Sequence, residues 1–296
     1  MKYKNLLNII GNTQVVELTK FSPNNKVKIL AKLEGSNPGG SVKDRIAYFM
    51  IMEARKKGSL NKNITIIEAT SGNTGIGLAM ISAYFGYKFT AVMPESVSIE
   101  RRKLIKAYGA EIILTDGAKG TNYAIQVANN LVKNNPGKFV QLDQFNNKMN
   151  VEAHYQTTGK EIIKQVPNIV HFVAGMGTGG TLMGVGKRLK EHNQNIKVIG
   201  VEPKTGSTIQ GLRNMKAYIP TIYKEDFLDK KLDLIEDMLA FDLARELYRK
   251  EGLSVGISSG AALWGAIEVA KTLKSGVIVT LFPDRGDRYT STQLFK

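Results

Sequence analysis

Short apolar runs alternate with amphipathic segments along almost the whole chain. Eight runs are rich in β-branched or other apolar residues and have the length of buried strands: 28–33, 64–68, 89–93, 111–115, 139–142, 169–173, 198–202 and 277–282. The amphipathic segments between them predict helices over 98–108, 121–132, 151–165, 180–191, 237–250 and 260–273. Alternation of this kind predicts an α/β fold with mostly parallel sheets covered by helices on both faces.

Three loops that join a predicted strand to a helix consist mainly of small polar residues. They are 68–75 (EATSGNTG), 175–181 (GMGTGGT) and 256–262 (GISSGAA). Ligands of such sheets bind at the carboxyl ends of the strands, and a helix start rich in hydroxyl and N–H groups suits a carboxylate or phosphate. The glycine spacing at 175–181 matches neither the dinucleotide fingerprint nor a Walker loop. Taken singly, each loop could also be a capped helix start without a ligand.

A lysine at an unusual place stands in the segment 37–45 (NPGGSVKDR). Lys43 follows a Pro-Gly-Gly turn, and we expect a helix to begin near Asp44. A cation near a helix N-terminus is electrostatically unfavourable. The placement makes sense if the amine is held as a Schiff base and its pKa is lowered by the same field. The alternative is an ordinary surface lysine.

Composition narrows the class of protein. The chain has 296 residues and 43% hydrophobic content, enough for one large domain or two modest ones. It has no cysteine, which excludes disulfides, thiolate metal sites and a catalytic thiol, and we expect no bound metal. The N-terminus lacks a small-residue cleavage site, and no apolar run approaches the roughly 20 residues of a membrane span. We therefore expect a mature cytoplasmic protein without a membrane partner.

The net charge is +15, from 41 basic and 26 acidic residues. Such an excess attracts anions, nucleic acid among them, or simply reflects a solvated lysine-rich surface. The basic residues are dispersed and form no stripe interleaved with aromatics, so we favour the surface interpretation and expect no nucleic-acid partner. A non-catalytic scaffold or a nucleic-acid binder is kept as the competing class.

Together the motifs resemble the β-replacing pyridoxal-phosphate family with the tryptophan-synthase-β fold (fold type II), which includes cysteine synthase and cystathionine β-synthase. Segments 37–45, 70–75, 177–181 and 256–260 stand in the family's order, as do 144–147 (QFNN), His154 and 157–159 (TTG). The resemblance extends from residue 10 to residue 289. The segments 68–70 (EAT), 142–147 (LDQFNN) and 284–289 (DRGDRY) are more similar to the B-type cysteine synthase than to the A-type.

The resemblance implies pyridoxal 5'-phosphate as cofactor and a role for each motif. Lys43 is the lysine that carries the cofactor. The other cofactor contacts are Asn73 at the 3-hydroxyl oxygen, Gly177, Thr178, Gly179, Gly180 and Thr181 at the phosphate, and Ser258 at the pyridine nitrogen. The substrate α-carboxylate is bound by Thr70, Ser71, Thr74 and Gln144.

These roles predict a reaction. A neutral serine leaves the ring nitrogen unprotonated, which weakens the electron sink and suits β-elimination. Lys43, once displaced by substrate, is the natural base for the α-proton. The leading function is therefore β-replacement through an aminoacrylate: O-acetyl-L-serine and sulfide give L-cysteine and acetate. O-phosphoserine and thiosulfate are alternative co-substrates.

Two features leave the choice of substrates open. Segment 209–220 differs from the glycine-rich A-type segment, and its Arg213 matches a B-type arginine that could bind an anionic substrate or could simply be exposed. The same site could also act in the other direction, releasing sulfide from L-cysteine to give serine, lanthionine or cystathionine. That direction needs an acid to activate water, for which Asp229 and Asp233 are weak candidates.

We expect two lobes with the cofactor between them. The smaller lobe covers 39–146 and includes a mobile part, about 86–132, that closes over substrate. The larger, cofactor-binding lobe combines 1–38 with 147–296. The family resemblance further implies a homodimer.

Overall fold

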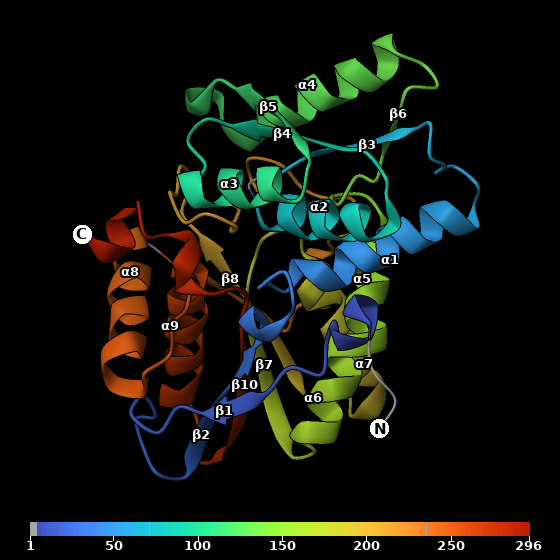
Figure 1. Cartoon of the computed structure of the whole chain (residues 1–296). Helices are drawn as coiled ribbons and strands as arrows, with labels where there is room; N and C mark the ends of the chain where they lie inside the picture. Colours follow the sequence, from blue (N-terminus) through green and yellow to red (C-terminus); the bar gives the residue numbers. More distant parts are fainter. Residues whose placement is uncertain (1–4, 71, 235) are drawn as a thin grey trace.

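The strands form two separate sheets (Figure 1), which a computed structural model describes over residues 5–70, 72–234 and 236–296. The larger sheet contains, in order, β1 (Val15–Glu17), β2 (Val27–Leu33), β10 (Gly276–Phe282), β7 (Ile169–Gly175), β8 (Lys197–Pro203) and β9 (Lys230–Leu234). The smaller contains β5 (Glu111–Thr115), β4 (Phe89–Pro94), β3 (Thr65–Ala69) and β6 (Phe139–Gln141). Among the described strands, only β1 runs antiparallel to its neighbour. The predicted α/β class with mostly parallel sheets is confirmed.

All eight predicted strands are present, with ends shifted by at most two residues, but two edge strands were not predicted. β1 has only three residues and is mostly half-buried, and β9 carries three charged residues among its five. Neither shows the continuous apolar run that marks a strand buried on both faces. Charged residues on an edge strand also discourage pairing with other chains.

Nine α-helices fill the connections between the described strands. They are α1 (Lys43–Lys56), α2 (Asn73–Phe85), α3 (Ile99–Ala107), α4 (Gly120–Asn134), α5 (Lys148–Ala153), α6 (Gly159–Gln165), α7 (Gly180–His192), α8 (Asp237–Glu246) and α9 (Ile257–Lys271). The single helix predicted over 151–165 was wrong in one respect: a π-helical turn, His154–Thr158, separates α5 from α6. Such insertions are frequent at functional sites.

The core of the larger sheet shows why helices cover both its faces. Successive residues of a strand point to opposite sides. In β7, Val173 packs in one buried cluster with residues of α8 and α9, whereas Phe172 and Ala174 pack in another with residues of α6 and α7. Figure 1 shows these helix pairs on opposite sides of the sheet. The central strands are therefore apolar on both faces at most positions, which is what made them recognisable in the sequence.

The strands of the smaller sheet all lie within 39–146, and those of the larger sheet lie outside that range. The exact lobe boundaries, and the mobility of 86–132, stay predictions. None of the helices in the described parts of the chain is long and apolar enough to cross a membrane.

A buried ionic network fastens α1 to the end of β2 and to α6. The guanidinium of Arg45 donates to both carboxylate oxygens of Glu34, at 2.7 and 2.8 Å, and to both of Glu161, at 2.6 and 2.8 Å. The amine of Lys32 lies 2.9 Å from Glu161. Arg45, Glu34 and Lys32 are almost completely buried. Because Arg45 stands two residues after Lys43, the network fixes the first turn of α1.

Replacing Arg45 by leucine should destabilise the protein strongly. The change leaves Glu34 buried without its counter-charge, which typically costs about 3–5 kcal/mol. The measurement is the free energy of unfolding from urea denaturation, compared at equal m-value. Lys28→Met is the matched control, because it breaks only the exposed Lys28–Glu17 pair and should cost less than about 1 kcal/mol. Similar losses for both variants would contradict the role of the network.

Candidate active site

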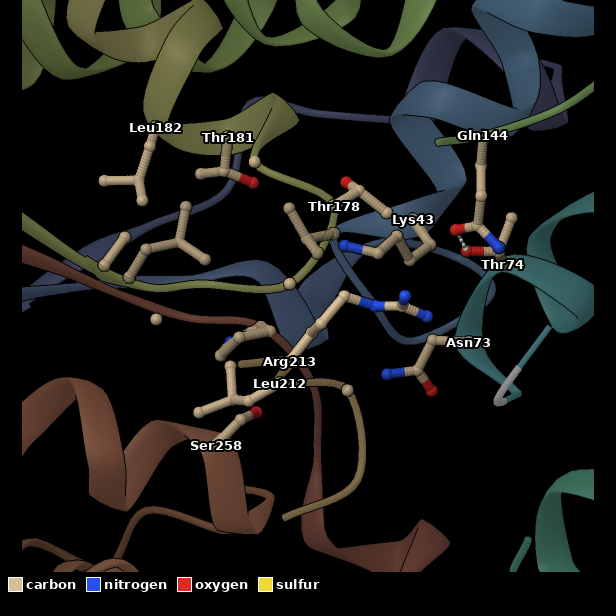
Figure 2. Close-up of a pocket in the computed structure, with 18 of the residues that line it drawn as sticks. Lys43, Asn73, Thr74, Gln144, Thr178, Thr181, Leu182, Leu212, Arg213 and Ser258 are labelled. Carbon is tan, nitrogen blue, oxygen red and sulfur yellow. Dashed lines mark hydrogen bonds between the residues drawn. The ribbon is translucent and has the colours of Figure 1, made fainter. Parts of the chain in front are cut away.

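A cavity at the carboxyl ends of the strands brings together residues from most of the predicted motifs. The lining includes Lys43, Asn73, Thr74, Gln144, Gly177, Thr178, Gly179, Thr181, Arg213 and Ser258 (Figure 2). Two predicted residues do not line it. Gly180 lies just behind the surface as the first residue of α7, and Thr70 is buried in the loop before α2. Ser71 lies outside the described residues.

Lys43 is the first residue of α1, and its side chain extends into the cavity toward Thr178 (Figure 2). Its backbone N–H is 3.2 Å from the hydroxyl of Ser41, so the lysine is held by the turn that precedes the helix. Burial lowers the pKa of Lys43 to about 8, although the negative charges of Asp284 and Glu34 act in the opposite direction. An amine with a lowered pKa is a competent nucleophile for an aldehyde, as Schiff-base formation requires.

The loop between β7 and α7 forms a cradle that fits a phosphate group. A Cβ atom added to Gly177 would lie 2.6 Å from the carbonyl oxygen of Gly211, and Gly179 has a φ of +85°. Only glycine fits both positions, so the backbone N–H groups stay accessible from the cavity. The 13-residue helix α7 starts at Gly180, and its positive end favours an anion there.

Two buried side chains hold the hydroxyls of the cradle. Asn150 donates to Thr178 Oγ1 at 2.9 Å, and His154 Nε2 lies 3.2 Å from Thr181 Oγ1. Burial lowers the pKa of His154 to about 3, helped by the positive charges of Lys43 and Arg45, so the ring is neutral. The π-helical turn begins at His154 and places its ring against α7. The cradle thus has the hydrogen-bonding groups and the fixed shape that the cofactor's phosphate needs.

The substrate side of the cavity centres on Thr74 and Gln144. The hydroxyl of Thr74 donates to Gln144 Oε1 at 2.6 Å, as Figure 2 shows. The hydroxyl of Thr70 instead accepts the N–H groups of Gly72 and Gly75, at 3.0 and 3.1 Å. Thr70 therefore shapes the loop from behind, whereas Thr74 and Gln144 present polar groups to the cavity.

Ser258 and Asn73 border the part of the cavity nearest to α9 and α2. Ser258 lies in the first turn of α9 and is nearly buried. None of the described residues that line the cavity is acidic, so the group available to a ring nitrogen is a neutral hydroxyl. Asn73 Nδ2 donates to Asp284 at 2.6 Å, and its Oδ1 accepts from Arg288 at 2.8 Å.

Arg213 lies across the cavity, with its guanidinium between Lys43 and Asn73 (Figure 2). It packs over the rings of Phe145 and Tyr218, at 4.6 and 4.9 Å, and donates to Asn122 of α4 at 3.0 Å. Burial lowers its pKa. Arg213 is therefore a cavity residue and not an exposed surface arginine.

Arg101, a buried arginine of α3 that lines the same cavity, was not among the residues predicted from the sequence. Its guanidinium lies 3.4 Å from Asp284 and 4.3 Å from the ring centre of Tyr289, and it contacts Gln210. Arg101 thus ties α3 to the segment that follows β10. The helix pattern gave no signal for it, because arginine is normally exposed and its partner is distant in the sequence.

Asp229 and Asp233 do not lie in this cavity. Asp229 pairs with Lys190 and Lys197, at 2.6 and 3.2 Å, and both aspartates line a separate surface groove that also contains His171. Neither can activate water beside Lys43 in this arrangement. Among the described residues, no group of three His, Cys, Asp or Glu side chains could hold a metal ion.

Comparison with known proteins gives a consistent result. A family model described as "Pyridoxal-phosphate dependent enzyme" matches residues 6–284. Cysteine synthase B of Salmonella typhimurium is 46% identical over 97% of this chain and 94% of its own length. The solved cysteine synthase (OASS) of Entamoeba histolytica superposes with a TM-score of 0.93, at 39% identity over 100% of this chain and 91% of its own. A hydrogen sulfide-producing enzyme of Fusobacterium nucleatum superposes with a TM-score of 0.91, at 43% identity over 97% and 100%.

The lowered pKa of Lys43 should control how fast cofactor-free protein takes up pyridoxal 5'-phosphate. Only the unprotonated amine attacks an aldehyde, so the rate should rise about tenfold per pH unit below pH 8 and level off above it. The absorbance of the bound cofactor near the visible edge reports the uptake. Lys43→Ala, measured in parallel, should develop no such band at any pH. A rate that keeps rising toward the ordinary lysine pKa would contradict this assignment.

Proposed function

Because this chain belongs to the family of pyridoxal-phosphate dependent enzymes, we propose that it makes L-cysteine from O-acetyl-L-serine and sulfide by β-replacement. The observation that carries this conclusion is one cavity that combines Lys43, a glycine-rich phosphate cradle and the neutral Ser258. The near-full-length likeness to cysteine synthases supports the same reaction.

The residues of the cavity divide the work among them. When bound, pyridoxal 5'-phosphate supplies an electron sink that stabilises negative charge at the substrate Cα. Lys43, in its base form, accepts the α-proton and returns it after the nucleophile has added. The cradle 177–181 binds the phosphate, Ser258 meets the ring nitrogen and Asn73 meets the 3-hydroxyl oxygen. Thr74 and Gln144, with the loop 70–75, bind the substrate carboxylate.

The preference for elimination follows from the neutral partner of the ring. A hydroxyl does not hold a proton on the pyridine nitrogen, so less charge is withdrawn into the ring. Loss of a good leaving group such as acetate then competes well with slower reactions at Cα. Ser258 lies in the first turn of α9, so the helix holds this neutral hydroxyl at the cavity.

We also propose that Arg213 selects anionic groups at the entrance to the cavity. Its side chain lies across Lys43, and none of the ion pairs among the described residues involves it. A desolvated guanidinium without a paired carboxylate suits a thiosulfate or a phosphate ester. Thiosulfate and O-phosphoserine are therefore the alternative nucleophile and donor.

The sulfide-releasing direction is not favoured. The Fusobacterium nucleatum enzyme shows that this scaffold can be associated with hydrogen sulfide production. In this chain, however, Asp229 and Asp233 lie in a groove outside the cavity. The two acids that were candidates for activating water therefore do not border the cavity that contains Lys43.

Assembly and location complete the proposal. A homodimer is expected from the family resemblance. A location in the cytoplasm is expected because the chain contains no cysteine, which fits a reducing compartment. The two-lobe division, with closure of 86–132 over substrate, belongs to the same expectation. Light scattering after size exclusion should give twice the chain mass of 32.6 kDa.

The direction of the reaction is tested by two product assays on the same preparation. O-acetyl-L-serine with sulfide should give L-cysteine, with a kcat/KM at least about a hundredfold above that for sulfide release from L-cysteine alone. The measurement is cysteine formed in the first assay and sulfide plus serine formed in the second. Comparable efficiencies would support the degradative alternative, and failure of both assays would contradict the synthesis of cysteine from O-acetyl-L-serine and sulfide.

The variant Arg213→Leu should separate the larger anionic co-substrates, thiosulfate and O-phosphoserine, from O-acetyl-L-serine and sulfide. The change keeps an apolar side chain over Phe145 but removes the charge, so kcat/KM should fall at least about tenfold with thiosulfate or O-phosphoserine. With O-acetyl-L-serine and sulfide, kcat/KM should fall about threefold or less, because these substrates depend less on the charge of Arg213. Arg249→Leu, on the exposed side of the chain, is the control. An equal loss with all substrates would show that Arg213 has no part in selection.

A further inference from the structure

One buried carboxylate near the cavity has no part in the chemistry described above. Glu68 is the fourth residue of β3 and is almost completely inaccessible to solvent. Its two oxygens accept the backbone N–H groups of Asp143 and Gln144, at 2.8 and 2.9 Å. Burying a carboxylate without a paired cation is costly, so these two N–H bonds are its compensation.

The backbone that Glu68 holds has an unfavourable conformation. Asp143 has a φ of +53°, in the left-handed region that residues other than glycine seldom occupy. Its carbonyl oxygen accepts the N–H groups of Asn146 and Asn147, at 3.0 and 2.8 Å, which closes a tight turn. The turn directs the successive N–H groups of Asp143 and Gln144 toward the carboxylate of Glu68.

The turn decides where the side chain of Gln144 goes. Gln144 Nε2 donates to the carbonyl oxygen of Ala69 at 3.0 Å, and Oε1 accepts from Thr74 at 2.6 Å. These two partners fix which end of the amide is which, because a carbonyl can only accept. The NH₂ group carries a second hydrogen, which remains for a ligand in the cavity.

We propose that Glu68 is a positioning residue for the β-replacement reaction, whose buried carboxylate sets the turn that presents Gln144 to the substrate α-carboxylate. The inference rests on the proposed function, since it takes Gln144 as the residue that binds that carboxylate. Glu68 lies at the end of β3, and the loop 70–75 follows directly after this strand. The end of β3 therefore positions both Gln144 and the loop that carries Thr74.

The protonation state of Glu68 is linked to the same contacts. Burial raises the pKa of Glu68 to about 8, while the N–H groups of Gln144 and Asp143 act in the opposite direction and the charge of Asp143 adds to the rise. Assays at about pH 9 therefore keep the carboxylate ionised in the unaltered protein.

The first test compares Glu68→Gln with Glu111→Gln. In the first variant an amide NH₂ replaces one oxygen and faces a backbone N–H, so the turn loses an acceptor. The KM for O-acetyl-L-serine should rise about tenfold or more with a smaller change in kcat, while the absorbance of bound cofactor is kept. Glu111 belongs to the same sheet but only accepts from Thr90 at 3.3 Å, so its variant should leave KM unchanged. An unchanged KM in Glu68→Gln would overturn the proposal.

A double-mutant cycle with Gln144→Ala then separates this proposal from the function on which it rests. Gln144→Ala alone should raise KM, and adding Glu68→Gln to it should raise KM no further, because both act through one contact. If Gln144→Ala leaves KM unchanged, the proposed role of Gln144 fails. If the two changes multiply, Glu68 acts independently of Gln144 and the positioning role is wrong.

A shorter acid covers the case in which Glu68→Gln does not fold. Glu68→Asp keeps the charge but withdraws it by one methylene from the two N–H groups. Its KM should rise less than that of the glutamine variant but clearly above that of Glu111→Gln. A KM equal to the unaltered protein would also count against the proposal.

Discussion

Four helices begin at the same cavity, and this convergence is the constraint on which the site depends. α1, α2, α7 and α9 each contribute a residue of their first turn to the lining, namely Lys43, Asn73, Thr181 and Ser258. Their free N–H groups and aligned dipoles create a positive field there. The field suits a phosphorylated cofactor and a substrate carboxylate, and it disfavours protonation of Lys43. The same geometry therefore prepares both the binding of anions and the reactivity of the amine.

No acidic residue among the described ones lines the cavity, and the acids that stabilise its positive groups lie behind the lining. The carboxylates that support the site stand one layer back: Glu34 under Arg45, Asp284 beside Arg101, and Glu68 behind Gln144. Each is buried, and each accepts hydrogen bonds from a group that the site needs in a fixed place. Negative charge thus supports the cavity from outside, where it does not compete with the anions to be bound.

The sequence predicted those parts of the structure that depend on local pattern. The buried strands were found because both of their faces are covered, and the loops after β3 and β7 were found because glycine and hydroxyl residues are needed where backbone approaches an anion. What it could not predict depends on partners far apart in the chain. Arg101 and Asp284 are separated by 183 residues, and Glu68 and Gln144 by 76. The π-helical turn at His154 was hidden for the same reason, because its purpose is to set that ring against α7.

Segment 209–220 contacts two helices that are distant from it in the sequence, α3 and α4. Segment 209–220 reaches α4 through Arg213, which donates to Asn122, and it reaches α3 through Gln210, which contacts Arg101. Asn122 and Arg101 both lie in the stretch 86–132 that is expected to close over substrate. Closure would therefore move Asn122 and Arg101 against the residues that face the leaving group and the nucleophile. In such an arrangement the ion that enters the cavity also affects how readily the smaller lobe closes, because each bound anion adds a partner for Arg213. If 86–132 closes as expected, the binding of an anion at Arg213 and the closing of this stretch would be parts of one equilibrium.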